Sequence, residues 1–182
     1  MKKNNDYFGM LTSAARLNEE IFKNITENRQ SGDKKLLFRA LQGEIFDSLL
    51  DEFIAPFERG DILSLARLLE RIFSCVCALE AFGRHKESDM LLKKLEPILR
   101  LMTSFSEMIS LLKSFKTPKK LINSLKEHKR AVENTLIGLK REMITQKEPT
   151  VFLHEFYSCE EALLEALFFA DIATERIIIN NN

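Results

Sequence analysis

Apolar residues recur along most of this 182-residue chain at intervals of three and four, the period of an α-helix. We expect the first helix to end near Ser31-Gly32-Asp33, where glycine stops one helix and aspartate caps the next. The second should end before Pro56, because the residue preceding a proline disfavours the helical conformation. The apolar stripes of these two helices are Phe8, Leu11, Ala14, Ala15, Leu17, Ile21, Phe22 and Ile25, then Leu37, Leu41, Ile45, Phe46, Leu49, Leu50 and Phe53.

Four further helices follow from capping, glycine and proline signals. Asp61 stands at the N-cap position of the third helix, and Pro97 lies in the first turns of the fourth or kinks it. No credible strand remains, so the sequence predicts an all-α fold of six long helices. The expected ranges are 33–54 and 61–83 for the second and third helices, about 88–112 for the fourth, 118–147 for the fifth and 150–179 for the sixth.

The two halves of the chain share a pattern at an offset of 91 positions. KKLLFRALQGEIF in the first half resembles LKEHKRAVENTLI in the second. An offset of half the chain predicts two pseudo-repeated three-helix bundles, about residues 1–87 and 88–182, within a single domain of residues 1–182. The matched pairs are Lys35 with Lys126, Arg39 with Arg130, Ala40 with Ala131, Leu41 with Val132 and Glu70 with Glu161.

Composition narrows the classes of function. The 27 basic and 27 acidic residues balance, so no global field attracts nucleic acid, and we expect no nucleic-acid partner. The chain has no signal-like start and no apolar run of the length that spans a bilayer. We therefore expect a cytoplasmic protein, with attachment to the inner face of the membrane left open. Cys75, Cys77 and Cys159 are expected to be buried, apolar thiols.

Residues 44–72, EIFDSLLDEFIAPFERGDILSLARLLERI, resemble a segment of the PhoU-like phosphate-transport regulators. The similarity is to the branch associated with Pit-type transporters, in which a helix ends in a Phe-x-x-Pro-x-Asp-Arg-x-Asp-Ile turn. Phe53, Pro56, Arg59 and Asp61 match this motif, and Glu58 stands where the motif has its first aspartate. YFGMLTSAARLNEE and EFYSCEEALLEALFFADIATERIII are similar to the opening and closing helices of that family.

The resemblance implies two three-helix bundles and a non-enzymatic, cytoplasmic accessory of phosphate uptake. Its expected partner is a protein, a Pit-type phosphate transporter at the membrane, and homo-oligomerisation is left open. Many members of the family bind iron or zinc clusters through Glu/Asp-x-x-x-Asp motifs, whose carboxylates share one helical face. The matching positions here are Lys35 with Arg39, Glu70 with Ser74, Lys126 with Arg130, and Glu161 with Glu165.

Only Glu161 and Glu165 survive as a carboxylate pair among these positions, and four bases would repel a cation. We therefore expect no metal and no other cofactor. The sequence instead predicts salt bridges in place of the clusters. Lys126 or Arg130 would reach Glu161 or Glu165, and Lys35 or Arg39 would reach Glu70. Simple solvation is the alternative, because His154, Ser158, Glu161 and Glu165 form one stripe at helical spacing.

The remaining polar residues are expected to lie on the protein surface in contact with solvent. The histidines, His85, His128 and His154, show no metal-ligand spacing and are expected at the surface. Glu44 with Asp47 and Asp51, and Asp171 with Glu175, are read as solvated helix faces. The bases between Lys113 and Arg130 predict either a solvated helix start or a patch that meets phosphate, acidic lipid or an acidic partner.

No catalytic motif is present, since nucleophile elbow, phosphate loop and dinucleotide fingerprint are all missing from the sequence. Three functions remain open. The first is a PhoU-like accessory protein that acts by contact. The second is a metalloprotein of the same fold with ligands from Glu161 and Glu165, and the third is a structural bundle without a phosphate role.

Overall fold

The structure is a computed structural model that describes residues 6–51, 59–82, 91, 93–112, 118–145 and 150–180. Every regular element in these ranges is helical and none is a strand, which confirms the all-α prediction. Most of the FIAPFERGDI corner, residues 53–58, lies outside the described residues. The helices are α1 (Tyr7–Thr26), α2 (Gly32–Asp51), α3 (Arg59–Phe82), α5 (Glu96–Leu112), α6 (Pro118–Thr145) and α7 (Val151–Asn180).

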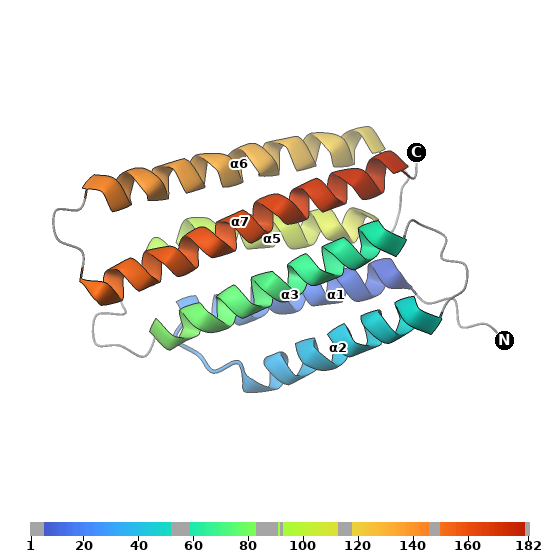
Figure 1. Cartoon of the computed structure of the whole chain (residues 1–182), viewed down its shortest axis with the longest axis horizontal. Helices are drawn as coiled ribbons and strands as arrows, with labels where there is room; N and C mark the ends of the chain where they lie inside the picture. Colours follow the sequence, from blue (N-terminus) through green and yellow to red (C-terminus); the bar gives the residue numbers. More distant parts are fainter. Residues whose placement is uncertain are drawn as a thin grey trace.

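These helices lie side by side along one long axis (Figure 1). The most extensive contacts join α3 to α7 and α1 to α5, so these four helices form the centre of the molecule. α2 and α6 flank the centre on opposite sides, α2 mainly against α1 and α6 against α7 and α5. Each group of three consecutive helices thus supplies two central helices and one flanking helix. Their equivalence at the 91-residue offset stays a prediction.

An asparagine, and not the expected glycine, ends α1. Asn28 has a positive φ of 53°, a conformation that asparagine tolerates better than most residues. The backbone N–H of Arg29 donates to the carbonyl of Asn24 at 2.7 Å, and that of Asn28 donates to Ile25 at 3.0 Å. These two hydrogen bonds satisfy carbonyl groups that have no donor within the helix, because they lie in its last turn. Gly32 is therefore the first residue of α2 and does not stop the helix before it.

The fourth predicted helix begins later than expected. α5 starts at Glu96, and Pro97 occupies its first turn, where a missing backbone N–H removes no helical hydrogen bond. Residues 91, 93 and 94 are helical, and the turn at residue 95 separates them from α5. α2, α3, α6 and α7 each begin within two residues of the predicted start, whereas the predicted ends at 54, 83 and 147 lie outside the described residues.

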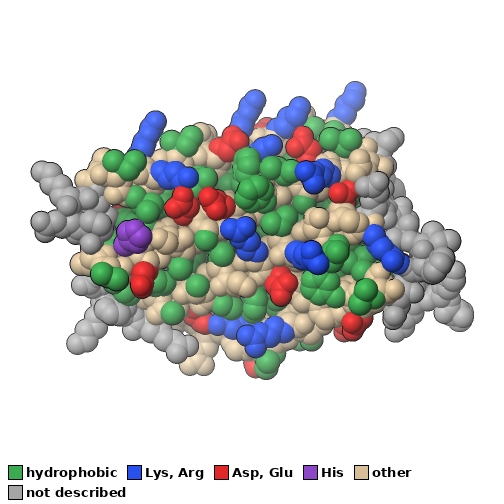
Figure 2. Space-filling model, viewed as in Figure 1, with side chains coloured by type: hydrophobic (Ala, Val, Ile, Leu, Met, Phe, Trp, Pro, Cys, Tyr) green, Lys and Arg blue, Asp and Glu red, His purple; other side chains and the backbone are tan. Residues whose placement is uncertain are grey.

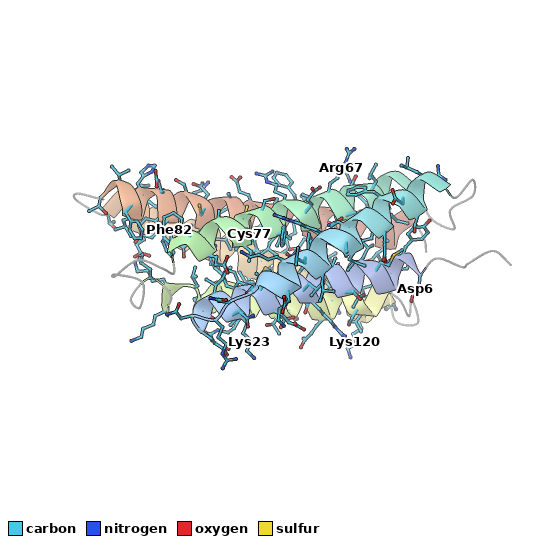
Figure 3. The ribbon with its side chains drawn as sticks, turned by 90° about the horizontal axis from the view of Figure 1, so that it is seen from below. Asp6, Lys23, Arg67, Cys77, Phe82 and Lys120 are labelled. Carbon is cyan, nitrogen blue, oxygen red and sulfur yellow. The ribbon has the colours of Figure 1, made fainter. Side chains whose placement is uncertain are left out.

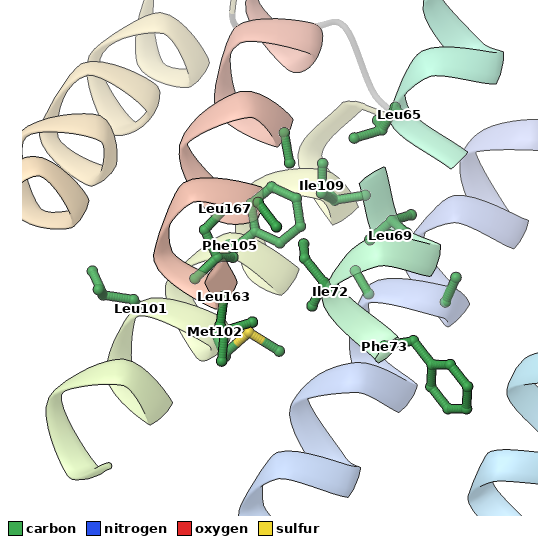
Figure 4. Packing of buried hydrophobic residues seen from close by; sticks show 14 of the residues in the cluster. Leu65, Leu69, Ile72, Phe73, Leu101, Met102, Phe105, Ile109, Leu163 and Leu167 are labelled. Carbon is green, nitrogen blue, oxygen red and sulfur yellow. The ribbon is translucent and has the colours of Figure 1, made fainter. Parts of the chain in front are cut away.

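The core is apolar and continuous across the central helices. Leu69 and Ile72 of α3 and Leu163 of α7 are each 0% exposed, and Phe105 of α5 lies beside them at 2% (Figure 4). Burying one such side chain stabilises the fold by roughly 1.5–3 kcal/mol. Polar side chains also join α1 to α5. Glu19 accepts hydrogen bonds from the hydroxyls of Thr103, at 2.8 Å, and Ser106.

The predicted apolar stripe of α2 is partly wrong. Leu37 and Leu50 were expected in the core but are 59% and 79% exposed. Ile45 at 0% and Leu49 at 5% are buried as predicted. The stripe omitted Phe38, which is 1% exposed and whose ring stacks on Phe73 with centroids 4.2 Å apart. Apolar residues occur on both sides of this helix, so spacing alone offers two candidate faces.

Two alanine substitutions test this corrected face. Ile45→Ala should lower the free energy of unfolding by about 2–5 kcal/mol, because it leaves a cavity in packed core. Leu50→Ala should change it by about 0.5 kcal/mol or less, because the side chain is already in solvent. Urea denaturation followed by circular dichroism measures both values. Equal losses at the two positions would contradict the observed rotation of α2.

Candidate functional site

The basic residues predicted to form salt bridges in the first half do not all form one. Lys35 of α2 pairs with Glu80 of α3, and both side chains are largely buried. The predicted acceptor Glu70 is exposed, as is Arg39, and neither has an ion pair among the described residues. The predicted contact with Glu70 is therefore wrong, although Lys35 does bind a carboxylate of α3, nearly three turns further along that helix.

The predicted pairs in the second half are also wrong. Glu161 binds Lys140 at 3.0 Å, and Glu165 lies 3.8 Å from Arg71 of α3. Lys126 and Arg130 are exposed and form no ion pair within the described ranges. The reason is the register of the two helices, which places Glu161 level with Lys140 and Asp171 level with His128, so Lys126 and Arg130 lie more than one turn away from both acids. Glu161 and Glu165 therefore do face basic side chains, but these are Lys140 and Arg71 and not the predicted Lys126 and Arg130.

These contacts bear on metal binding at Glu161 and Glu165. Each carboxylate already faces a cation, and the hydrogen bond from Lys140 to Glu161 raises the pKa of that lysine. Within the described residues, no three His, Cys, Asp or Glu side chains gather in a group able to hold a metal ion. A hard cation bound by Glu161 and Glu165 would first have to displace Lys140 and Arg71.

The turn motif of the resemblance lies only partly within the structure. Phe53 and Pro56 fall outside the described residues, and Arg59 is the first residue of α3. Asp61 lies in the first turn of α3 and accepts a hydrogen bond from the side-chain amide of Asn180 at 2.7 Å. This contact ties the start of α3 to the end of α7.

A buried histidine and aspartate form a pair that the sequence interpretation missed. His128 of α6 and Asp171 of α7 have side chains only 1% and 0% exposed, so the expected surface positions of both are wrong. The Nδ1 atom of His128 lies 2.8 Å from Oδ2 of Asp171, and its Nε2 atom lies 2.9 Å from the carbonyl oxygen of Leu101. The pair therefore joins three helices of the second group, α5, α6 and α7.

The chemistry of this pair is that of a structural contact. A carbonyl oxygen only accepts, so Nε2 of His128 must donate to Leu101, and Nδ1 and Asp171 share the second proton. Burial lowers the pKa of His128, but the hydrogen bond and charge of Asp171 outweigh burial and raise it overall. Burial also raises the pKa of Asp171. With both ring nitrogens engaged and no exposed atom, His128 is not available as a base for a substrate.

A second polar cluster connects the segment before α5 with α6 and α7. Lys94 forms an ion pair with Glu142 and donates to the hydroxyl of Tyr157 at 2.8 Å. That hydroxyl donates in turn to Glu142 at 2.9 Å. The hydrogen bond from Lys94 lowers the pKa of Glu142, as expected for an acid that is stabilised in its charged form.

Glu160 lies one turn beyond Tyr157 on α7 and is 2% exposed. No donor in the described part of the chain forms a hydrogen bond with its carboxyl group. Burial raises its pKa to about 8, an effect that the charge of Lys94 only partly offsets. Glu160 is therefore largely protonated at neutral pH.

The three cysteines do not form a reactive site. Cys75, Cys77 and Cys159 are half-buried, somewhat less than expected. Burial raises the pKa of each thiol above its ordinary value. Since the thiolate is the nucleophile and the metal ligand, raised pKa values oppose both roles.

The outward side of α6 carries a group of exposed bases, defined here as the α6 basic face. None of its members has an ion-pair partner within the described ranges, and the chain as a whole has no net charge. Blue side chains project from the upper edge of the molecule, where α6 lies (Figure 2). The members of the α6 basic face are Lys119, Lys120, Lys126 and Arg130.

Comparisons with known proteins give no relative from which to take a function. No protein-family model, no curated protein and no solved structure matches this chain. The similarity to the PhoU-like regulators therefore rests on the sequence segments named above. Among the described helices, none combines the length and the apolar character needed to cross a membrane.

Glu160 gives a testable dependence of stability on pH. Its pKa is raised from 4.5 to about 8 in the folded state, so between these values the folded chain holds an extra proton. Stability should then be greatest at low pH and fall as pH rises through this window, by up to about 1.4 kcal/mol per pH unit. Glu160→Gln should flatten the profile, since glutamine imitates the neutral acid.

Urea denaturation at several values between pH 5 and pH 8 measures this effect. Glu127→Gln, at an exposed position of α6, is the matched control and should leave the profile unchanged. The raised pKa of His128 adds its own fall in stability above its ordinary pKa of 6.5, and this fall is common to both variants. Parallel profiles for Glu160→Gln and the unsubstituted chain would contradict the assignment.

Proposed function

We propose that this chain is a non-enzymatic, PhoU-like accessory protein of inorganic phosphate uptake. It acts by protein contact, and its partner is a Pit-type phosphate transporter. The proposal takes its biological setting from the resemblance in residues 44–72 and at the two ends of the chain. It is supported by two groups of three helices and by buried polar residues that hold helices together and present no reactive atom to a substrate.

The α6 basic face is the observation that carries the proposed contact. The four exposed bases outnumber the two exposed acids of the same stretch of α6, Glu127 and Glu133, and so create a local positive field on a neutral protein. Such a field favours an acidic surface, and rim charges of this kind increase the rate and selectivity of association. We assign the α6 basic face to an acidic cytoplasmic segment of the transporter. Charge pairs between exposed groups weaken as salt increases, so this binding should depend on ionic strength.

Charge reversal on α6 tests this contact. Lys126→Glu combined with Arg130→Glu should weaken binding to the detergent-solubilised transporter of the same genome by about tenfold or more at 0.05 M salt. The loss should shrink at 0.5 M salt, where screening removes most of the attraction. Biolayer interferometry with immobilised transporter measures both affinities.

Lys23→Glu combined with Arg67→Glu makes the same change in charge at exposed positions of α1 and α3 (Figure 3). This control should bind like the unsubstituted chain. An equal loss in both variants would mean that total charge, and not the α6 basic face, drives association. No binding by the unsubstituted chain, together with unchanged phosphate uptake after deletion of the gene, would support the structural bundle instead.

The metalloprotein alternative has its own test. Protein purified without chelator should carry less than about one equivalent of iron, zinc or manganese, because Lys140 and Arg71 occupy the carboxylates that would bind the ion. Elemental analysis measures the content. Stoichiometric metal that disappears in Glu161→Gln or Glu165→Gln would overturn the proposal in favour of the metalloprotein.

A further inference from the structure

The outward side of α2 is apolar at both ends and lacks a covering element in the described chain. It points away from the buried residues Phe38, Ile45 and Leu49, and α2 lies at the edge of the molecule (Figure 1). Seen from below, α2 crosses in front of α1 and α3 (Figure 3). All members of this side, called the α2 outer stripe, are exposed. They are Leu36, Arg39, Ala40, Gly43, Asp47 and Leu50.

The two leucines of the stripe are among the most exposed large apolar residues of the described chain. Leu36 is 65% exposed and Leu50 is 79% exposed. Leu36 lies seven residues before Gly43 and Leu50 seven residues after it. Seven residues make about two helical turns, so all three lie on the same side of α2. Covering both leucines would remove a substantial apolar area from water, which is the main favourable term in association.

Gly43 has no explanation within a single copy of the chain. It lies in the middle of α2, where glycine costs about 1 kcal/mol relative to alanine. A Cβ atom added to it would meet no atom within 4 Å, so no neighbour in the chain requires its small size. Glycine in an exposed helix face does permit a second backbone to approach closely.

The charges of the stripe are self-complementary about Gly43. Arg39 lies four residues before it and Asp47 four residues after it. Neither has an ion-pair partner among the described residues, and eight positions apart on one helix they cannot reach each other. If a second α2 lay antiparallel across the first at Gly43, Arg39 of each copy would face Asp47 of the other. The same operation places Leu36 of each copy opposite Leu50 of the other.

We infer that the chain forms a two-fold symmetric homodimer through antiparallel packing of α2 on α2, with the axis at Gly43. The occupant of the stripe is a second copy of this chain, because the two leucines and the two charged residues are each matched by a complementary residue at equal distance from the axis. Two-fold dimers require this self-complementarity. The inference is independent of the proposed function, since α6 lies on the opposite side of the molecule and stays free in the dimer (Figure 1).

The first experiment measures the dissociation constant of the full chain by sedimentation velocity over a range of concentrations. Leu36→Glu combined with Leu50→Glu should weaken the dimer by about a hundredfold or more, because it places charges in the contact. Ile144→Glu is the control, because Ile144 is 83% exposed on α6, far from the stripe. It should leave the dissociation constant unchanged.

Charge exchange distinguishes this dimer from any other. Arg39→Asp alone and Asp47→Arg alone each place like charges opposite one another, so each variant should be monomeric or at least about tenfold weaker. A mixture of the two variants should dimerise again, because both cross-pairs then join Asp to Arg. Gly43→Met should also break the dimer by blocking close approach, without lowering the thermal midpoint of the monomer.

Recovery of association in the mixture, with normal binding of Ile144→Glu, supports the antiparallel dimer. A chain that stays monomeric up to about 0.1 mM overturns the inference, as does a dimer that survives the leucine and glycine substitutions. Association of the unsubstituted chain with anionic vesicles in place of dimerisation would assign the stripe to a membrane and would equally overturn it. Each of these results leaves the salt-dependent binding of the α6 basic face intact.

Discussion

The burial of apolar side chains between α3 and α7 is the constraint on which the rest of the structure depends. It is the most extensive contact between helices in the described chain, and it joins the first group of helices to the second. The contact fixes the rotation of α3 and α7 about their axes, so it also decides which charges lie at its rim. Arg71 lies 3.8 Å from Glu165 for this reason, although neither position suggests the other in the sequence.

Buried polar side chains then fix the helices relative to one another. The amide of Asn18 donates to the carbonyl of Leu69 at 2.9 Å, and that of Gln42 donates to Ala66 at 3.1 Å. His128 reaches Leu101 in the same way. Each bond joins one helix to the backbone of another and forms only at one rotation of the helix that carries the donor. Apolar contact alone tolerates small rotations, whereas a buried donor without its acceptor costs about 1–3 kcal/mol.

The sequence predicts the helical class and most helix starts because hydrophobic period, proline and capping residues are local signals, whereas the end of α1 and the start of α5 differ from expectation. It predicts the centre of the buried face of α2 at Ile45 but not its edges, since Leu37 and Leu50 also recur at helical spacing and yet are exposed, whereas Phe38 is buried. The interpretation of charged residues failed for a related reason. His128 and Asp171 are far apart in the chain and have no motif spacing, so only their position on two facing helices shows that they pair. A signal was available in Asp171, a carboxylate within the apolar run LFFADIA.

The two flanking helices differ most on their outward sides. At the predicted 91-residue offset, Glu127 of α6 corresponds to Leu36 of α2, and Arg141 corresponds to Leu50. These two positions are thus apolar on one flank and charged on the other, whereas the inward sides of both helices are mainly apolar, with Gln42 and His128 as buried polar exceptions. A central core constrains only inward positions, so the outward ones are free to serve different contacts. An apolar, self-complementary stripe favours a second copy of the same chain, and an unpaired basic face favours an acidic partner of another kind.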